Sequence, residues 1–133
     1  MLVSAAVVVD VAVLRSSPTP QLRNSPEASV IIGIGVDMVD VDRIKAAVER
    51  RGEQFVQRAF TEEEAAYCWR SQCPERRFAA RFAAKEAVMK ALGRGWFQGM
   101  PFREIEVTRD ETEEGYGRPG VRLSGKTAAL AER

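Results

Sequence analysis

FAARFAAKEAVMKALGRG, residues 78–95, is the stretch around which this chain is built. Its six alanines leave little side-chain bulk over much of its surface, while phenylalanine and methionine supply bulky apolar groups. Pro74 and Gly93 flank the pattern as start and stop signals, because proline suits a first helical turn and glycine suits a helix C-terminus. We therefore predict one long helix, from about Glu75 to Leu92, that forms a core and lets another element approach its backbone closely.

The segments on either side of this helix predict an α+β fold. A strand pattern and three helix patterns precede it, and two short strand patterns, joined by a glycine-rich turn, and a final helix follow it. Thr61 and Glu64 form a capping-box pattern at the start of one of these helices. We expect a small antiparallel sheet packed on the long helix. The predicted strands cover 30–36, 104–109 and 121–123, and the other predicted helices cover about 42–51, 53–59, 61–71 and 126–131.

The composition is that of one globular domain. The chain has 133 residues, of which 45% are apolar and 29% charged. A net charge of +1 gives no general attraction to nucleic acid or to a membrane surface, so neither is expected as a partner. Cys68 and Cys73 lack a CxxC spacing, which argues against a disulfide scaffold and for a reducing, cytoplasmic location. Histidine is absent, which excludes histidine-based triads and histidine metal sites.

Residues 1–29 differ in composition from the rest of the chain. The segment 2–14 is apolar and β-branched, but it is too short to span a bilayer. Residues 15–29 carry three prolines together with serine, threonine and asparagine, which is typical of linkers. We therefore expect residues 1–29 to be a disordered extension and linker, and residues 30–133 to form the folded domain. The alternative is that Ala5–Leu14 adds a strand to the sheet.

Two carboxylates, Asp37 and Glu86, indicate a metal site. Asp37 follows the first predicted strand, in which Gly33 and Gly35 indicate a bulge or the close approach of another backbone. A carboxylate at the exit of a strand can reach into a cleft, and Glu86 lies on the long helix. Two carboxylates are enough for Mg²⁺, which keeps several waters and takes further oxygen ligands from substrate phosphates. We therefore predict that Asp37 and Glu86 bind Mg²⁺.

Basic residues accompany Glu86 along the long helix. Glu86 and Lys90 are four residues apart on one face, which by itself is the pattern of an ordinary helix-stabilising ion pair. Gly93 and Gly95 follow, and a glycine-rich loop with bases nearby, here Lys90 and Arg81, can present backbone N–H groups to a phosphate. Because this loop follows a helix C-terminus, where the dipole disfavours anions, it is not a P-loop.

Arg43 and Arg50 are seven residues apart on one face of a basic predicted helix. One interpretation is an ordinary solvated surface. The other is a docking face for an acidic protein partner, which would act through electrostatic steering more than through buried contact. The residues alone leave both interpretations open.

Two separated stretches, GIGVDMVDVDRI at 33–44 and FAARFAAKEAVMKALGRG at 78–95, resemble holo-acyl-carrier-protein synthases, the small bacterial type of 4′-phosphopantetheinyl transferase. The likeness runs from Ile31 to the C-terminus and includes FTEEE at 60–64 and GRPGVRLSG at 117–125. It implies a 4′-phosphopantetheinyl transferase-like α+β fold, assembled as a homotrimer with active sites between subunits. It also implies transfer of 4′-phosphopantetheine from coenzyme A to a serine of apo-acyl carrier protein in fatty acid biosynthesis, with release of adenosine 3′,5′-bisphosphate.

The resemblance implies a catalytic set of Asp37, Glu86 and Lys90. The two carboxylates are implied as Mg²⁺ ligands, and Lys90 as the base beside the transferred phosphate. Positioning and electrostatic stabilisation dominate reactions of this kind. The serine proton could pass to a metal-bound water or to Glu86, since the chain has no histidine and a carboxylate or water is the only evident base near neutral pH.

The resemblance also implies binding residues. Arg81 and Lys85, together with the loop Gly93–Gly95, are implied as contacts for the phosphates of coenzyme A. Arg43 is implied as a contact for the acidic helix of the carrier protein, and Arg50 shares its face.

This sequence departs from the family pattern at both ends. The first 30 residues lie outside the pattern, and the chain stops where family members continue with further strands. An alternative is therefore a catalytically inactive, truncated homologue that only binds carrier protein or other subunits. A second alternative is an unrelated α+β module whose charged helices are solvated faces.

Overall fold

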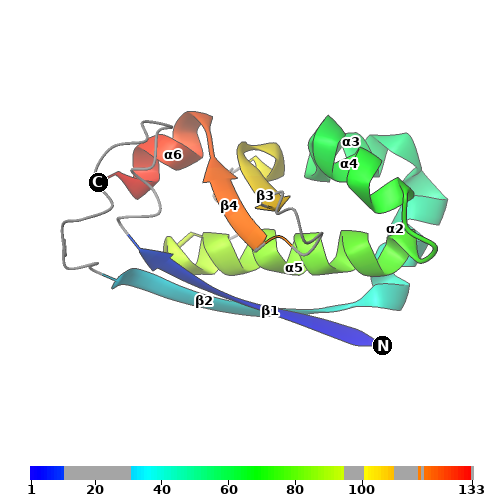
Figure 1. Cartoon of the computed structure of the whole chain (residues 1–133), viewed down its shortest axis with the longest axis horizontal. Helices are drawn as coiled ribbons and strands as arrows, with labels where there is room; N and C mark the ends of the chain where they lie inside the picture. Colours follow the sequence, from blue (N-terminus) through cyan, green and yellow to red (C-terminus); the bar gives the residue numbers. More distant parts are fainter. Residues whose placement is uncertain (11–30, 95–100, 110–116, 118, 133) are drawn as a thin grey trace.

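The long helix α5 (Pro74–Ala91) lies at the centre of the computed structural model, which describes residues 1–10, 31–94, 101–109, 117 and 119–132. A two-stranded antiparallel ribbon of β1 and β2 lies along one side of α5, and a β3–β4 hairpin lies on the other (Figure 1). Helix α5 begins with Pro74 in its first turn and is followed by Gly93 at φ 69°, as predicted. The other elements are β1 (Leu2–Asp10), β2 (Ile31–Asp40), α2 (Val41–Arg51), α3 (Glu53–Ala59), α4 (Glu62–Trp69), η2 (Phe102–Glu104), β3 (Ile105–Arg109), β4 (Pro119–Leu123) and α6 (Gly125–Ala131).

The expectation of a mixed α+β fold with small antiparallel sheets on a long helix is confirmed. Thr61 and Glu64 form the predicted capping box at the start of α4, with Thr61 N to Glu64 Oε2 at 2.8 Å and Glu64 N to Thr61 Oγ1 at 3.2 Å. Gly52 separates α2 from α3 at φ 53°, a left-handed conformation that suits glycine.

Strand β2 approaches the backbone of α5 closely enough to exclude side chains. A Cβ atom on Gly33 would overlap the carbonyl oxygen of Ala91, and one on Gly35 would overlap that of Ala87. The glycines on the strand and the alanines on the helix therefore pack directly against one another. Close backbone approach, which the interior glycines indicated, is what the structure shows.

The N-terminal segment differs from the expected disorder. Residues Leu2–Asp10 form β1, which pairs antiparallel with β2 from Leu2 opposite Asp40 to Asp10 opposite Ile31. The alternative expectation, a strand added by Ala5–Leu14, agrees better with the structure, although the observed strand starts at Leu2. The physical reason is that β2 has an edge of backbone N–H and C=O groups that a second strand can pair. The expected linker falls in 11–30, which lies outside the described residues.

Pairing with β1 also extends β2 beyond its predicted end. The predicted strand stopped at Val36 and left Asp37 at the exit, whereas β2 continues to Asp40 because β1 supplies partners as far as Leu2. Asp37 is therefore inside the strand, opposite Ala5. The chain leaves the strand at Asp40, whose Oδ1 caps α2 by accepting a hydrogen bond from the backbone at 3.0 Å.

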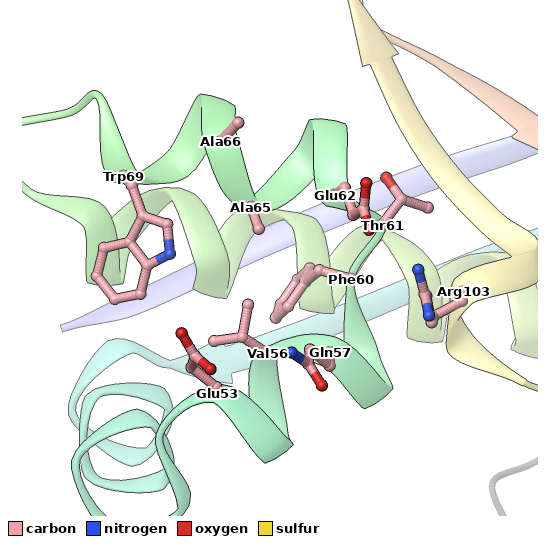
Figure 2. A pocket seen from close by; sticks show the side chains of 10 residues that line it. All are labelled: Glu53, Val56, Gln57, Phe60, Thr61, Glu62, Ala65, Ala66, Trp69 and Arg103. Carbon is pink, nitrogen blue, oxygen red and sulfur yellow. The ribbon is translucent and has the colours of Figure 1, made fainter.

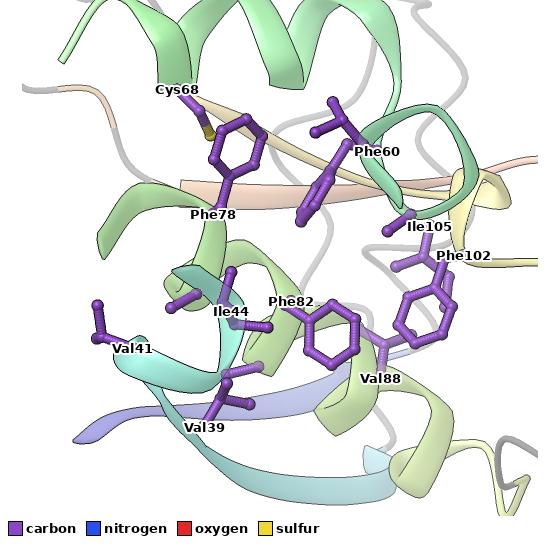
Figure 3. Close-up of a cluster of buried hydrophobic side chains, with 14 of the residues drawn as sticks. Val39, Val41, Ile44, Phe60, Cys68, Phe78, Phe82, Val88, Phe102 and Ile105 are labelled. Atoms are coloured by element: carbon purple, nitrogen blue, oxygen red, sulfur yellow. The ribbon is translucent and has the colours of Figure 1, made fainter. Parts of the chain in front are cut away.

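The core lies between α5 and the surrounding helices and hairpin (Figure 3). Phe82 stacks on Phe102 with ring centroids 5.0 Å apart, and Phe78 contacts Phe60 at 4.9 Å. Full burial of a side chain of this size stabilises the fold by about 1.5–3 kcal/mol. These aromatic contacts connect α5 to η2 and to the end of α3.

Candidate active site

Asp37 is the centre of the candidate site. Side chains alternate along β2, so Asp37 shares the inward face with Gly35 and Val39 and points towards α5. Only 9% of its surface is exposed. The strand therefore presents a carboxylate, where an apolar residue would be ordinary, to the helix that carries Glu86 and Lys90.

Lys90 supplies a cation to this carboxylate. Its Nζ atom lies 2.7 Å from Asp37 Oδ1 and donates a second hydrogen bond to the carbonyl oxygen of Val36 at 3.3 Å. The Lys90 side chain is 56% exposed, so its ammonium group can also reach solvent. The hydrogen bond that Lys90 donates to Asp37 raises the pKa of Lys90, which keeps this side chain charged.

Glu86 lies beside the same carboxyl group. Burial raises the pKa of Asp37, but a side-chain hydrogen bond with Glu86, and then the hydrogen bond and charge of Lys90, lower it further than burial raises it. Asp37 and Glu86 can share that hydrogen bond only when one of them is protonated. When both are ionised, two carboxylates face each other with one lysine nearby. Such a pair favours an additional cation.

The donor set fits Mg²⁺. The Oδ2 atom of Asp37 is buried and accepts no hydrogen bond from any described residue, so it is an oxygen with ligand capacity to spare. Glu86 offers a second carboxylate. Within the described ranges, no group of three or more His, Cys, Asp or Glu side chains gathers that could hold a metal ion. Water and substrate phosphates would therefore complete the octahedron, as is usual for Mg²⁺.

Lys85 lies on a different face of α5 from this cluster. Its Nζ atom donates to Glu64 Oε2 at 2.6 Å, to the carbonyl of Ala59 at 2.6 Å and to that of Phe102 at 3.1 Å. The residue has no exposed surface, and burial lowers its pKa while Glu64 opposes that effect. A contact with a coenzyme A phosphate, which the resemblance implies for Lys85, would require some of these bonds to break.

Arg81 occupies the same side of α5 as Lys85. Its guanidinium carbon lies 4.0 Å from the ring centroid of Tyr67, which Arg77 approaches at 4.4 Å. Arg81 is only 7% exposed, and its Nε has no hydrogen-bond partner among the described residues. The structure therefore separates Arg81 and Lys85 from the Asp37 cluster, although the sequence places all of these bases on one helix.

The remaining predicted residues are distributed as follows. Gly93 ends α5 at φ 69°, beside the Lys90 end of the helix. Gly95 lies outside the described residues. Arg43 and Arg50 are exposed on α2, and neither forms an ion pair with another described residue. Their side chains are therefore available to a partner.

A hollow of about 650 Å³ lies between α3 and α4 (Figure 2). Phe60 and Val56 form its floor, and Arg103 lies at one end. None of the predicted site residues lines it. The full lining is Glu53, Val56, Gln57, Phe60, Thr61, Glu62, Ala65, Ala66, Trp69 and Arg103.

Glu64 is the residue whose importance the sequence did not reveal. The capping-box pattern identified it only as a helix-start residue, yet it is 2% exposed and forms a salt bridge with Lys85. Its partner lies 21 residues away, a spacing that no local pattern connects.

Comparison with known proteins identifies the family. The sequence profile of the 4′-phosphopantetheinyl transferase superfamily matches residues 33–131. A holo-[acyl-carrier-protein] synthase from Solibacter usitatus is 44% identical over 104 residues, which cover 78% of this chain and 80% of that protein. The chain belongs to the holo-acyl-carrier-protein synthase family of this superfamily. The resemblance seen in the two motifs is thereby confirmed.

Solved structures of the synthase family have the same fold. The crystal structure of the holo-[acyl-carrier-protein] synthase from Neisseria meningitidis matches with a TM-score of 0.63 and 34% identity, covering 75% of this chain and 76% of that one. The Helicobacter pylori synthase, solved in complex with coenzyme A, matches with a TM-score of 0.60 and 27% identity, covering 73% and 78%. Among the described residues of this family member, no helix is long and apolar enough to cross a bilayer.

Proposed function

We propose that this chain transfers 4′-phosphopantetheine from coenzyme A to a serine of apo-acyl carrier protein, with Mg²⁺ as cofactor and adenosine 3′,5′-bisphosphate as product. The observation that carries the proposal is the convergence of Glu86 and Lys90 on the inward-facing carboxylate of Asp37. Membership of the synthase family and the coenzyme A complex of the Helicobacter pylori relative support it.

Each residue of the cluster has a role in this proposal. Asp37 and Glu86 would hold Mg²⁺, which would neutralise charge on the diphosphate as the phosphorus–oxygen bond breaks. Lys90 can exchange its bond to Asp37 for one to a phosphate oxygen, because its side chain is 56% exposed. Its positive charge would then stabilise the departing phosphate.

Glu86 is the group on this chain best placed to accept the serine proton. The chain has no histidine, so a carboxylate is the side chain here that can act as a base near neutral pH. Asp37 is more buried and bonded to Lys90, which makes it the poorer acceptor.

Two surfaces support the proposed partners. Arg43 and Arg50 on α2 provide an exposed basic face for an acidic carrier protein. On β2, Ile34, Val36 and Met38 alternate with the inward residues and are 57–65% exposed. Apolar strand faces of this kind are typical of subunit contacts, which is consistent with the predicted homotrimer. Size-exclusion chromatography with light scattering would determine the subunit number. The cytoplasmic location stays a prediction.

A mass-spectrometric assay tests the proposed function. The protein is incubated with Mg²⁺, coenzyme A and apo-acyl carrier protein, and the carrier is examined for the phosphopantetheine mass increment. We expect the increment, and we expect EDTA to abolish it. Absence of the increment, with carrier binding retained in a pull-down, would instead favour the inactive, carrier-binding homologue.

A further inference from the structure

Lys85 and Glu64 form a salt bridge that is closed to solvent. Lys85 Nζ lies 2.6 Å from Glu64 Oε2, and the two side chains are 0% and 1% exposed. The carbonyl oxygens of Ala59 and Phe102 accept the other two hydrogen bonds of the ammonium group, at 2.6 and 3.1 Å. A lysine ammonium has three N–H donors, so each of them has an acceptor within the protein.

Both carboxylate oxygens of Glu64 also accept hydrogen bonds from the protein. Its Oε2 accepts a hydrogen bond from Thr61 N at 2.8 Å as well as the one from Lys85, and its Oε1 accepts one from Val107 N at 2.8 Å. The pair therefore connects α5 to the end of α3, the start of α4, η2 and β3.

Lys85 directly precedes Glu86 on α5. Consecutive residues on an α-helix point about 100° apart. Because Lys85 is fixed on the side of α4 and β3, Glu86 is turned away from that side, towards β2, where Asp37 lies. The buried pair thus constrains the rotation of α5 about its axis.

We propose that Lys85 and Glu64 are positioning residues that aim Glu86 at Asp37, and that Lys85 makes no contact with substrate. This inference rests on the proposed function, because it concerns the carboxylate pair of that reaction. A direct phosphate contact would leave the Glu64 carboxylate buried without its counter-charge, which is strongly unfavourable. The geometry thus favours an indirect role over the coenzyme A contact that the resemblance implied.

The first test compares Lys85→Arg with Lys85→Met. Arginine is the better phosphate donor, so a substrate contact would tolerate arginine and not methionine. A closed site with three fixed acceptors has no room for the larger guanidinium. We therefore expect Lys85→Arg to lower the melting temperature at least as much as Lys85→Met, whereas Lys45→Arg at an exposed position of α2 should not lower it. A Lys85→Arg variant with wild-type melting and coenzyme A KM would overturn the proposal.

The second test removes both charges together. The double variant Lys85→Met with Glu64→Gln removes both charges and keeps one oxygen, which can still accept one of the two backbone hydrogen bonds that Glu64 receives. In the folded fraction, we expect the KM for coenzyme A to stay within about threefold of wild type while kcat falls about tenfold or more, because small misplacement of a reacting group is costly. Mg²⁺ affinity, measured by calorimetry without coenzyme A, should fall in parallel.

Two outcomes of the second test contradict the proposal. A KM for coenzyme A raised about tenfold or more at unchanged kcat would identify Lys85 as a substrate contact. Unchanged kcat and unchanged Mg²⁺ affinity in a folded variant would reduce the pair to a structural role. If the double variant does not fold, Glu64→Gln alone tests the positioning role, because it breaks the charged pair and leaves Lys85 in place. That variant should also lower kcat and Mg²⁺ affinity without raising the KM for coenzyme A.

The proposed function can fail separately. A wild-type chain that transfers no phosphopantetheine would disprove the reaction, while the melting comparison and the Mg²⁺ titration would still test the positioning of Glu86.

Discussion

Lys90 Nζ lies 2.7 Å from Asp37 Oδ1, although 53 residues separate the two in the chain. The contact joins β2 to the C-terminal half of α5 at the place where Glu86 also reaches the same carboxyl group. It can form because Gly33 and Gly35 on the strand meet Ala91 and Ala87 on the helix without side chains between them. The chemistry of the site therefore depends on the absence of side-chain bulk elsewhere on the same two elements.

Replacing either carboxylate should abolish transfer without unfolding the protein. We expect Glu86→Gln and Asp37→Asn each to lower kcat by about 100-fold or more, since loss of one preorganised electrostatic group typically has this effect. Each variant should also lose the calorimetric Mg²⁺ binding that the wild type shows. Circular dichroism on the same samples gives the control. Loss of the fold in Glu86→Gln would mean that Glu86 is structural.

Reversing the charge of the exposed basic face of α2 should weaken carrier recognition. We expect Arg43→Glu with Arg50→Glu to raise the KM for acyl carrier protein about tenfold, with the KM for coenzyme A unchanged, because steering charges act on the protein partner. The wild-type KM for the carrier should rise with salt, and this salt dependence should shrink in the variant. Equal KM values for the carrier in variant and wild type, at low salt, would leave this face as an ordinary solvated surface.

A methyl group at Gly35 should separate β2 from α5. The added Cβ of Gly35→Ala meets the backbone carbonyl of Ala87, which cannot move without shifting the helix. We expect a loss of about 3 kcal/mol in the free energy of unfolding, at the upper end for overpacked sites. Gly120→Ala is the matched control on β4, because its nearest atom is the movable Oγ1 of Thr108 at 3.0 Å. Urea unfolding curves of the two variants should differ clearly, and equal midpoints would contradict the packing described.

Glu104 should contribute stability that disappears in acid. Its Oε2 accepts hydrogen bonds from Thr127 N at 2.8 Å and Thr127 Oγ1 at 2.9 Å, which holds the start of α6 against η2. The backbone hydrogen bond of Thr127 is the main cause that lowers the pKa of Glu104 from its ordinary 4.5. A lowered folded-state pKa gives stability that is complete above the unfolded value and is lost as the pH falls through the folded value.

The measurement for Glu104 is the melting temperature as a function of pH. Between neutral pH and the region below 4.5, Glu104→Gln should show a shallower decline than the wild type, because the amide does not titrate. Curves that fall in parallel would assign the acid sensitivity to other carboxylates.

The two cysteines should differ sharply in reactivity. Burial is the main cause that raises the pKa of Cys68 to about 11, whereas Cys73 is exposed. Because the thiolate is the reactive form, iodoacetamide at mildly alkaline pH should alkylate Cys73 first and reach Cys68 only on unfolding. Peptide mapping after increasing times would show the order. Simultaneous modification of both residues under native conditions would place Cys68 outside the core.

Local patterns predicted much of the fold. The start and end of α5 follow from Pro74 and Gly93, and the capping box at Thr61 follows from a spacing of three residues. These features form between residues that are close in the chain, so a local sequence pattern is enough to predict them. The candidate Mg²⁺ pair was predicted for a similar reason, because each carboxylate sits within its own recognisable motif.

The spacing of the basic residues on the long helix did not predict which neighbour each of them contacts. In the sequence, the three bases of the long helix look like one basic track, but on α5 they contact different neighbours. Arg81 lies over the ring of Tyr67. Lys85 pairs with Glu64, and Lys90 pairs with Asp37. Which face of a buried helix meets which element depends on long-range packing, and this information is spread over the whole chain.

By itself, the sequence determined the family, the long helix and the two motifs that supply Asp37 and Glu86. Only the tertiary structure decided that residues Leu2–Asp10 pair with β2, that Asp37 lies within the strand, and that Lys85 is sealed against Glu64. The physical reason is that helix caps and motifs are satisfied by residues a few positions away, whereas an open strand edge and a buried charge must find partners brought in from distant parts of the chain.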